Sequence, residues 1–427
     1  MFDYIVVGAG IVGLSTAYHI KRLDPGASVL VIDKAPGPGG GDTGRSAAAF
    51  RAFFTNKANM LLSKSSIAFY RSVQEAGFDL GMRFIGYLWL VDRRAQPRVD
   101  AALRHADALG LPYERVDLGL VEERLGLRAS VRGLEEAELM GLDDVGEAIL
   151  VKEAGILDPD RLVEYYYEKL RSMGVEFRFG SRVVEFIVEP RRPLGIEGEP
   201  LPWQDSRVSG VRLEGGLEAR ARRKVIAALG AWSDQALRAI GVDPVSKPKK
   251  RQIFVVRAST GELSQILHAR GFNAEGVMPF TILPRDVLIR PEPREEAFWI
   301  GLSDNLGRPF KLEEPPAPEE HYYTLGILPV LSAYMPAFEG LYPETSWAGH
   351  YDMSPDGLPV VYEPFDSDLI VACGTSGSGI MKGDAIGRVA ASLALGLEEA
   401  ELADGSTMPV AWLGVQGRMA ERELLII

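Results

Sequence analysis

The first fifty residues hold the feature that most constrains the fold of this chain. An apolar run, Tyr4–Val7, leads into Gly8, Gly10 and Gly13, and a helical stretch and a second apolar run follow before Asp33. Gly8 allows a sharp turn out of the strand, Gly10 lets a diphosphate approach the backbone, and Gly13 lets the helix pack against the sheet. The N-terminus of the helix presents free N–H groups to phosphate, and Asp33 has the spacing of a ribose-binding carboxylate. This unit predicts a dinucleotide site, with NAD and FAD both open; the alternative is a glycine turn that serves packing alone.

Length and charge limit the remaining possibilities. The chain has 427 residues, more than one compact core accommodates, so we expect two closely packed domains. Its net charge of −12 argues against nucleic acid and an anionic membrane surface as partners, and we interpret the basic runs Lys247–Arg251 and Arg220–Lys224 as solvated faces or linkers. Cys373 is the single cysteine, and no histidine–carboxylate cluster has metal spacing, so we expect neither a disulfide nor a metal site. No apolar run is long enough to span a bilayer, which predicts a cytoplasmic protein, with a peripheral membrane contact left open.

Two further glycine-rich stretches point to ligand contact. The stretch Gly41–Arg51 carries small residues and two arginines, Arg45 and Arg51, directly after the first unit. It is typical of a backbone that approaches a flat or charged ligand, although a flexible surface loop is the alternative. Near the other end, the predicted strand Leu369–Ala372 leads into Gly374–Gly379 and a helix. A second helix N-terminus of this kind suits an anion or a polar ring edge, although an ordinary strand-to-helix turn is the alternative.

Local patterns predict elements between these stretches. Asp158 and the proline after it are typical of an N-cap and a first helical position. Helices are expected over 56–75, 159–173, 318–334 and 380–395, and separate strands over 217–221 and 224–229.

Four stretches occur in an order that resembles the D-amino-acid-oxidase-like family of FAD enzymes. That family includes sarcosine oxidases, glycine oxidase, dimethylglycine dehydrogenase and dye-linked L-proline dehydrogenase. The stretches are Gly8–Gly13 with Asp33-Lys34, Gly41–Arg51, Ala227–Ser233 and Ser346–Gly387. The resemblance implies an α/β fold with a Rossmann-type FAD-binding domain and a mixed-sheet, α+β substrate domain over the flavin ring. We expect the FAD domain to comprise residues 1–80, 152–241 and 342–427, and the substrate domain residues 81–151 and 242–341.

The resemblance also implies cofactor contacts, position by position. Pyrophosphate would be held by Gly8, Gly10, Ile11, Val12 and Gly13, and the adenosine ribose region by Asp33 and Lys34. Gly44, Arg45 and Ser46 would run along the phosphates and ring, Val183 would hold the adenine, and Gly230 and Trp232 would complete the site. The flavin end would be bordered by Gly377, Ser378, Gly379, Ile380, Met381 and Lys382. The cysteine that some relatives use for covalent attachment falls near Gly349, and Thr43–Phe50 has no histidine, so we predict non-covalent FAD.

Candidate substrate residues follow from the chemistry of an amino acid. Its carboxylate needs a cation, for which Arg51 is the first choice and Arg290 the second, because guanidinium can bind carboxylate bidentately. A structural ion pair is the alternative for each. His350 and Tyr351 are candidates for the substrate border, with a purely structural histidine as the alternative. We also expect the apolar residues Leu424–Ile427 to dock at a subunit interface or near the substrate cavity.

A single complete dinucleotide fingerprint argues that the electron donor is a small substrate and that oxygen, a quinone, a dye or another protein is the acceptor. The leading hypothesis is an amino-acid or secondary-amine dehydrogenase. L-Proline is favoured because Gly41–Phe54 resembles the corresponding loop of dye-linked L-proline dehydrogenases. The alternatives are a sarcosine or glycine oxidase that releases hydrogen peroxide, a non-catalytic FAD-bound electron-transfer subunit, and an NAD-binding protein without flavin. The oligomeric state stays open, with a homo-oligomer possible.

Overall fold

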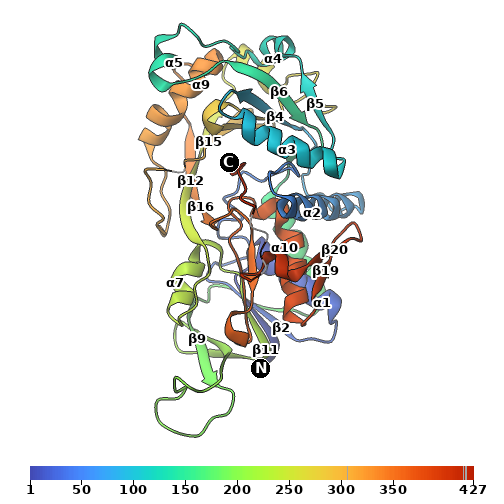
Figure 1. Ribbon diagram of the computed structural model, residues 1–427, viewed down its shortest axis with the longest axis vertical. Coiled ribbons are helices and arrows are strands. Elements are labelled where there is room, and N and C mark those ends of the chain that lie inside the picture. Colours follow the sequence, from blue (N-terminus) through green and yellow to red (C-terminus); the bar gives the residue numbers. More distant parts are fainter. Residues whose placement is uncertain (305, 417, 419–420) are drawn as a thin grey trace.

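The computed structural model describes residues 1–304, 306–416, 418 and 421–427, and Figure 1 shows how its elements are arranged around two large sheets. The first sheet has the order β17-β18-β11-β1-β2-β8, with β10 and then β9 branching from β11. Its strands are β1 (Phe2–Val7), β2 (Val29–Ile32), β8 (Glu176–Arg178), β9 (Val183–Pro190), β10 (Ser206–Leu213), β11 (Glu218–Ala227), β17 (Val360–Tyr362) and β18 (Leu369–Cys373).

The centre of this sheet is parallel, because β1 pairs in parallel with both β2 and β11, and β11 pairs in parallel with β18. These central strands are buried on both faces, as their apolar sequences require. Helix α1 (Ile11–Leu23) packs against α10 (Gly379–Ala394) and α6 (Pro159–Ser172), and α10 also packs against α2 (Lys57–Glu75). The layered strand–helix arrangement confirms the predicted Rossmann-type α/β unit.

Strand β11 is longer than predicted. The separate strands expected over 217–221 and 224–229 form one strand, Glu218–Ala227, which pairs antiparallel with β10 near its start and parallel with β1 along the rest. The charged residues Arg222 and Arg223 led to the predicted break. In the structure they lie inside the strand and pair with Asp3 and Asp24.

The second sheet has the order β16-β12-β15-β14-β13-β4-β6-β5 and is mixed, because β13 is parallel to β4 and the other neighbours are antiparallel. Its strands are β4 (Tyr87–Asp92), β5 (Tyr113–Val116), β6 (Val145–Val151), β12 (Lys247–Arg257), β13 (Phe280–Ile282), β14 (Val287–Glu292), β15 (Ala297–Leu302) and β16 (Thr345–Met353). Strand β16 belongs to this sheet although it lies in the range expected for the FAD domain. The domain boundaries therefore stay a prediction.

Shorter elements complete the second unit and the connections. The helices are α3 (Gln96–Leu109), α4 (Leu118–Leu125), α5 (Glu135–Met140), α7 (Ser233–Arg238), α8 (Gly261–Leu267) and α9 (Leu328–Tyr334). Two small sheets pair β3 (Ala49–Phe50) with β7 (Gly155–Ile156), and β19 (Glu399–Glu401) with β20 (Thr407–Pro409). No helix among the described residues has the length and apolarity to cross a bilayer.

Helix starts follow the predicted capping chemistry. Asn56 and Asp158 each accept hydrogen bonds from two backbone N–H groups at the start of α2 and α6. The helix expected over 318–334 is shorter and in two parts, a π-helical turn at Tyr322–Ile327 followed by α9. Pro329 lies at this junction and has no N–H to donate to the preceding turn, which accounts for the irregular geometry.

Candidate active site

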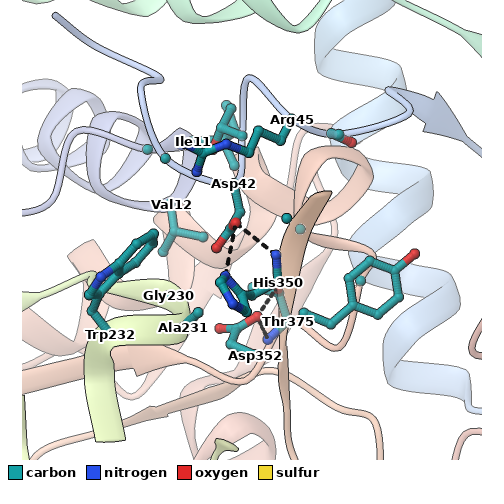
Figure 2. Close-up of a pocket in the computed structure, with 18 of the residues that line it drawn as sticks. Ile11, Val12, Asp42, Arg45, Gly230, Ala231, Trp232, His350, Asp352 and Thr375 are labelled. Carbon is teal, nitrogen blue, oxygen red and sulfur yellow. Dashed lines mark hydrogen bonds and ion pairs between the residues drawn. The ribbon is translucent and has the colours of Figure 1, made fainter. Parts of the chain in front are cut away.

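A cavity of about 690 Å³ lies between the first sheet and strands β12 and β16, in the size range of small-molecule and cofactor sites. Both predicted glycine turns open onto it, and so does the loop that precedes Arg51. Figure 2 shows part of this lining, with the N-terminal residues of α1 and strand β16 on opposite sides of Asp42. The cavity therefore collects residues from both ends of the chain.

The first glycine turn is held by the backbone. Gly8 has φ +108°, and a Cβ there would lie 2.2 Å from the carbonyl oxygen of Ala228, while a Cβ on Gly13 would lie 1.9 Å from the carbonyl oxygen of Gly8. Gly8, Gly10, Ile11 and Val12 line the cavity, whereas Gly13 permits the helix to pack. The first turn of α1 has no acidic side chain, so its free N–H groups remain attractive to a phosphate.

Asp33 stabilises this turn and also lines the cavity. Its Oδ2 accepts a hydrogen bond from the backbone N–H of Ala9 at 2.7 Å, and its Oδ1 accepts one from Ala35 at 2.8 Å. Each carboxylate oxygen has a second lone-pair direction, so Asp33 can accept a further bond from a ligand hydroxyl.

The loop between the glycine turns is fixed at three points. Asp42 Oδ1 accepts from the backbone N–H of His350 at 2.8 Å, Thr43 Oγ1 accepts from Ile11 at 3.1 Å, and the carbonyl of Arg45 accepts from the indole of Trp347 at 2.9 Å. Among the described residues, no group accepts a hydrogen bond from the half-buried Arg45 guanidinium, which lines the cavity as Figure 2 shows. A ligand phosphate would supply the missing anion. Ser46 lines the cavity beside it, and Gly44 supports the loop through a hydrogen bond to Gly39 at 3.0 Å.

The outer end of the cavity is closed by a loop from the second unit. The ammonium of Lys34 lies 3.8 Å from the centroid of the Trp232 ring and pairs with Glu314, which also pairs with Arg182 at 3.0 Å. Val183 and Gly230 line the same end.

The second glycine turn leads into α10 and depends on side chains. A Cβ on Gly377, which has φ +81°, would lie 2.1 Å from Cε2 of Tyr351. Asp352 Oδ1 accepts from the backbone N–H of Thr375 at 3.0 Å and from its hydroxyl at 2.5 Å. Burial raises the pKa of Asp352 to about 6, against the hydrogen bonds from Thr375, which lower it. The first turn of α10 carries no acidic side chain, and Gly377, Ser378, Gly379, Ile380 and Met381 line the cavity.

Lys382 lies apart from the other predicted contacts of this turn. It is fully buried, its ammonium donates to Asn59 Oδ1 at 2.7 Å, and it lies 4.3 Å from the centroid of the Phe54 ring. Burial lowers the pKa of Lys382 to about 7. It faces α2 and is absent from the described cavity lining, whereas Met381 is present in it.

Arg51 lies on the inner wall of the cavity and is buried. Its guanidinium hydrogen-bonds the carbonyl of Phe53, and its Nη2 donates to the carbonyl of Leu425 at 2.6 Å. Aromatic rings surround it, with centroids of Phe54 at 4.1 Å and Trp89 at 5.3 Å. Burial lowers the pKa of Arg51 from its ordinary value, against nearby Tyr87 and Glu423, which raise it; within the described residues no carboxylate forms an ion pair with it.

Tyr351 lies near Arg51 in the same wall, and its hydroxyl donates to the carbonyl of Ile427 at 2.7 Å. His350 also lines the cavity, where its Nε2 accepts from the backbone N–H of Glu313 at 3.2 Å. That bond assigns the proton of neutral His350 to Nδ1, which lies 3.7 Å from Asp42 Oδ1. His350 therefore links the cavity wall to the closing loop.

The structure separates Arg290 from the other candidates. It pairs with Glu292 at 2.7 Å, lies 4.0 Å from the centroid of Trp299, and is absent from the described cavity lining. Arg251, which we interpreted as part of a solvated basic run, does line the cavity and pairs with Asp304 at 2.9 Å. A signal was available, because residues 249, 251 and 253 lie on one face of a strand, but a run of four charges obscured the alternation.

A Rossmann-type sheet and a mixed sheet that share a cavity with two glycine turns define a dinucleotide-dependent oxidoreductase. A family model described as "FAD dependent oxidoreductase" matches residues 3–393, and the chain belongs to this family. The family predicted from the motifs is thereby confirmed, and FAD is its cofactor.

Individual relatives are distant. The chain is 26% identical over 423 residues to FAD-dependent oxidoreductase domain-containing protein 1 of Xenopus laevis, covering 92% of this chain and 78% of that protein. It is 24% identical over 406 residues to monomeric sarcosine oxidase of Streptomyces avermitilis, covering 92% and 94%. Its structure is similar to that of L-proline dehydrogenase from P. horikoshii, with a TM-score of 0.72, 20% identity, and 97% and 96% of the two chains covered. This similarity confirms the predicted fold class.

The residues present fit FAD. Both glycine turns offer helix N-termini to the cavity, and Arg45 offers a cation for the diphosphate. When bound, the flavin ring would supply the site that accepts two electrons from a substrate. The α1 turn would hold the diphosphate, and the N-terminus of α10 would favour negative charge on the ring edge beside it.

Proposed function

We propose that the protein is an FAD-dependent dehydrogenase of amino acids or secondary amines, with L-proline as the favoured substrate. The observation that carries this proposal is Arg51, a buried cation that lines the cavity and forms no ion pair among the described residues, although the charge of buried Glu423 acts on it. An amino-acid carboxylate would bind to it, and the ring of Phe54, which also lines the cavity, would contact an apolar substrate ring.

The reaction removes two electrons and two protons from the substrate. The amine must be neutral, so that its lone pair can form the C=N bond as the hydrogen on the neighbouring carbon leaves with its electron pair. Bound flavin would supply the acceptor of that hydride. The amine proton then passes to solvent, and the product is an imine. Arg51 would fix the carboxylate, Tyr351 would border the reacting carbon, and the buried walls would exclude water from the transfer.

FAD is proposed to bind without a covalent link. By resemblance, the cysteine of some relatives falls near Gly349 on β16, where a side chain would meet Arg45 and Asp42. Cys373 is the last residue of β18 and is buried; its thiol contacts the carbonyl of Pro244 at 3.3 Å, and burial raises its pKa to about 12. Neither position offers a reactive thiol to the cavity.

We propose that the natural electron acceptor is a quinone, another protein or oxygen, rather than an oxidised nicotinamide cofactor. A sarcosine- or glycine-type oxidase is the second candidate, favoured by the similarity to monomeric sarcosine oxidase across 92% of the chain. A non-catalytic FAD-bound subunit is the third.

Anaerobic reduction of bound flavin tests the proposal. L-Proline, sarcosine, glycine and D-amino acids are added in turn, and the loss of flavin absorbance is followed. We expect L-proline to reduce the flavin fastest. We expect Arg51→Gln to lower kcat/KM about 100-fold, since a charged hydrogen bond contributes about 1.5–3 kcal/mol, with unchanged FAD content.

The control is Arg290→Gln, which removes a paired arginine outside the described lining and is expected to change kcat/KM less than about threefold. Peroxide formation in air would favour the oxidase over the dehydrogenase. Failure of every amine to reduce the flavin would exclude both and leave the non-catalytic subunit.

A further inference from the structure

The segment Glu423–Ile427 runs along the substrate side of the cavity, and Leu425, Ile426 and Ile427 line it. Its position near β16 and α2 is visible in Figure 1, where the end of the chain lies in the middle of the molecule. The cavity therefore takes part of its wall from residues far from every recognised motif.

The segment is anchored by a buried carboxylate. Glu423 accepts hydrogen bonds at 2.9–3.1 Å from the backbone N–H groups of Thr55, Asn56 and Leu425, from the Thr55 hydroxyl and from the Asn59 amide. Asn56 is the N-cap of α2, so the carboxylate also lies at the positive end of that helix. Asn59, which donates to Glu423, also accepts a hydrogen bond from the Lys382 ammonium, so a positive charge lies near the carboxylate. These contacts fix the backbone direction at Glu423.

Two backbone oxygens beyond this anchor meet the proposed substrate residues. The carbonyl of Leu425 accepts from Arg51, and the backbone oxygen of Ile427 accepts from the hydroxyl of Tyr351. Arg51 has five N–H donors, so the bonds to Phe53 and Leu425 orient the guanidinium while leaving other donors for a carboxylate. The segment thus orients the group that would hold the substrate.

The apolar side chains of the segment set the free space. Leu425 is fully buried, and Ile426 packs so closely on Gly357 that a Cβ there would lie 2.8 Å from Ile426 Cδ1. Ile426 and Ile427 remain partly accessible and face the cavity, whereas Leu424 is 47% exposed and is absent from the described lining.

We propose that Leu425–Ile427, anchored by Glu423, is the specificity-determining wall of the substrate site, with Ile426 and Ile427 limiting the size of the amine and the Leu425 carbonyl positioning Arg51. The inference rests on the proposed function, because it assigns a size limit to the same substrate site. It predicts that shortening these two side chains enlarges the set of amines accepted, without loss of FAD.

The test compares L-proline with L-pipecolate, its six-membered-ring homologue, in the FAD-loaded wild type and in Ile426→Ala, Ile427→Ala and Leu424→Ala. One methylene is commonly discriminated by about 10–200-fold in an apolar pocket. We expect the preference for proline, as a ratio of kcat/KM values, to fall about tenfold in one or both isoleucine variants. We expect Leu424→Ala to keep the wild-type ratio within about twofold.

A second readout requires no turnover. Tetrahydro-2-furoate and its six-membered homologue carry the carboxylate without an oxidisable amine, and their binding is followed by perturbation of the flavin spectrum. The isoleucine variants should bind the larger carboxylate more tightly relative to the smaller one. Unchanged ratios in both readouts, with FAD retained, would overturn the proposed wall while leaving the amine-oxidation proposal standing.

If no amine reduces the wild-type flavin, the proposed function is wrong. The binding ratios of the two carboxylates then test on their own whether the segment limits ligand size. A shift toward the larger carboxylate in the isoleucine variants would then support it, and equal ratios would overturn it. A chain that stops after Glu423 adds a further variant, expected to lose the preference more completely than either point variant.

Discussion

The two glycine turns open onto the same cavity but need glycine for different reasons. At Gly8 the space for a Cβ is taken by a backbone carbonyl, at 2.2 Å from Ala228, whereas at Gly377 it is taken by the ring of Tyr351, at 2.1 Å. The first turn is therefore a property of the sheet itself. The second turn requires glycine because the Tyr351 side chain of the other sheet packs against it, and a smaller side chain at position 351 would relieve that contact.

The largest effect is expected at the first turn. In Gly8→Ala, a methyl group would meet the Ala228 carbonyl and the residue would keep φ near +108°, so the turn must move. We expect destabilisation of about 4 kcal/mol or more and loss of bound FAD. Thermal unfolding and the flavin-to-protein ratio measure both. Gly37→Ala is the matched control, because nothing lies within 4 Å of its added Cβ, and normal FAD content in Gly8→Ala would contradict the prediction.

The second turn should respond more weakly and should be rescuable. Gly377→Ala overlaps the Tyr351 ring, and we expect a loss of about 2–3 kcal/mol together with weaker FAD binding. Adding Tyr351→Ala removes the ring and should restore part of the FAD binding, although the positive φ still costs about 1–2 kcal/mol. A double variant as impaired as the single one would show that the ring is not the obstacle and would remove the distinction between the turns.

A carboxylate holds each turn, Asp33 the first and Asp352 the second. The raised pKa of Asp352 predicts a pH-dependent contribution to the free energy of unfolding. An aspartate whose pKa is raised from 3.8 to about 6 binds its proton more tightly in the folded state. Its contribution to stability is therefore present below pH 4 and is lost between about pH 4 and pH 6, by at most about 3 kcal/mol at 1.36 kcal/mol per pKa unit.

Asp352→Asn lacks this titration while its amide oxygen can still accept from Thr375. We expect the melting temperature of the variant, relative to wild type, to be higher at pH 7.5 than at pH 4.5. A difference that does not change with pH would refute the assignment of the titration to Asp352.

The smallest effect is expected at the outer end, where the contacts are half exposed. Glu314→Gln removes the ion pairs with Lys34 and Arg182, whose side chains are 29% and 47% exposed. Such pairs contribute less than about 1 kcal/mol, so we expect FAD affinity to fall less than about fivefold, and less at high salt. Titration of the FAD-depleted protein with FAD at two ionic strengths measures this. A loss as large as that of Gly377→Ala would show that the closing loop is a principal part of the site.

Sequence predicted best what the backbone imposes locally. Gly8, Gly13 and Asp33 lie within one strand–helix–strand unit, so their spacing was enough to predict the first half of the site. Asp158, directly before a proline, was likewise enough to predict the start of a helix. Contacts between distant residues were harder. Lys382 and Met381 are neighbours in sequence, but the helical rotation between them sends one to Asn59 and the other to the cavity. Arg51 ranks above Arg290 by its position after the glycine loop, and the pairing of Arg290 with Glu292 is local, because residues two apart on a strand lie on one face.

The parallel pairing of β11 has a consequence for how the protein is made. β1 is synthesised well before its sheet neighbours, because β11 ends at Ala227 and the next strand, β18, ends at Cys373. The first glycine turn packs against the carbonyl of Ala228, so it lacks its final contacts until that residue has been synthesised. The second turn follows β18 and forms later still. Cofactor loading should therefore follow the synthesis of β18 and the second glycine turn rather than accompany that of the first turn.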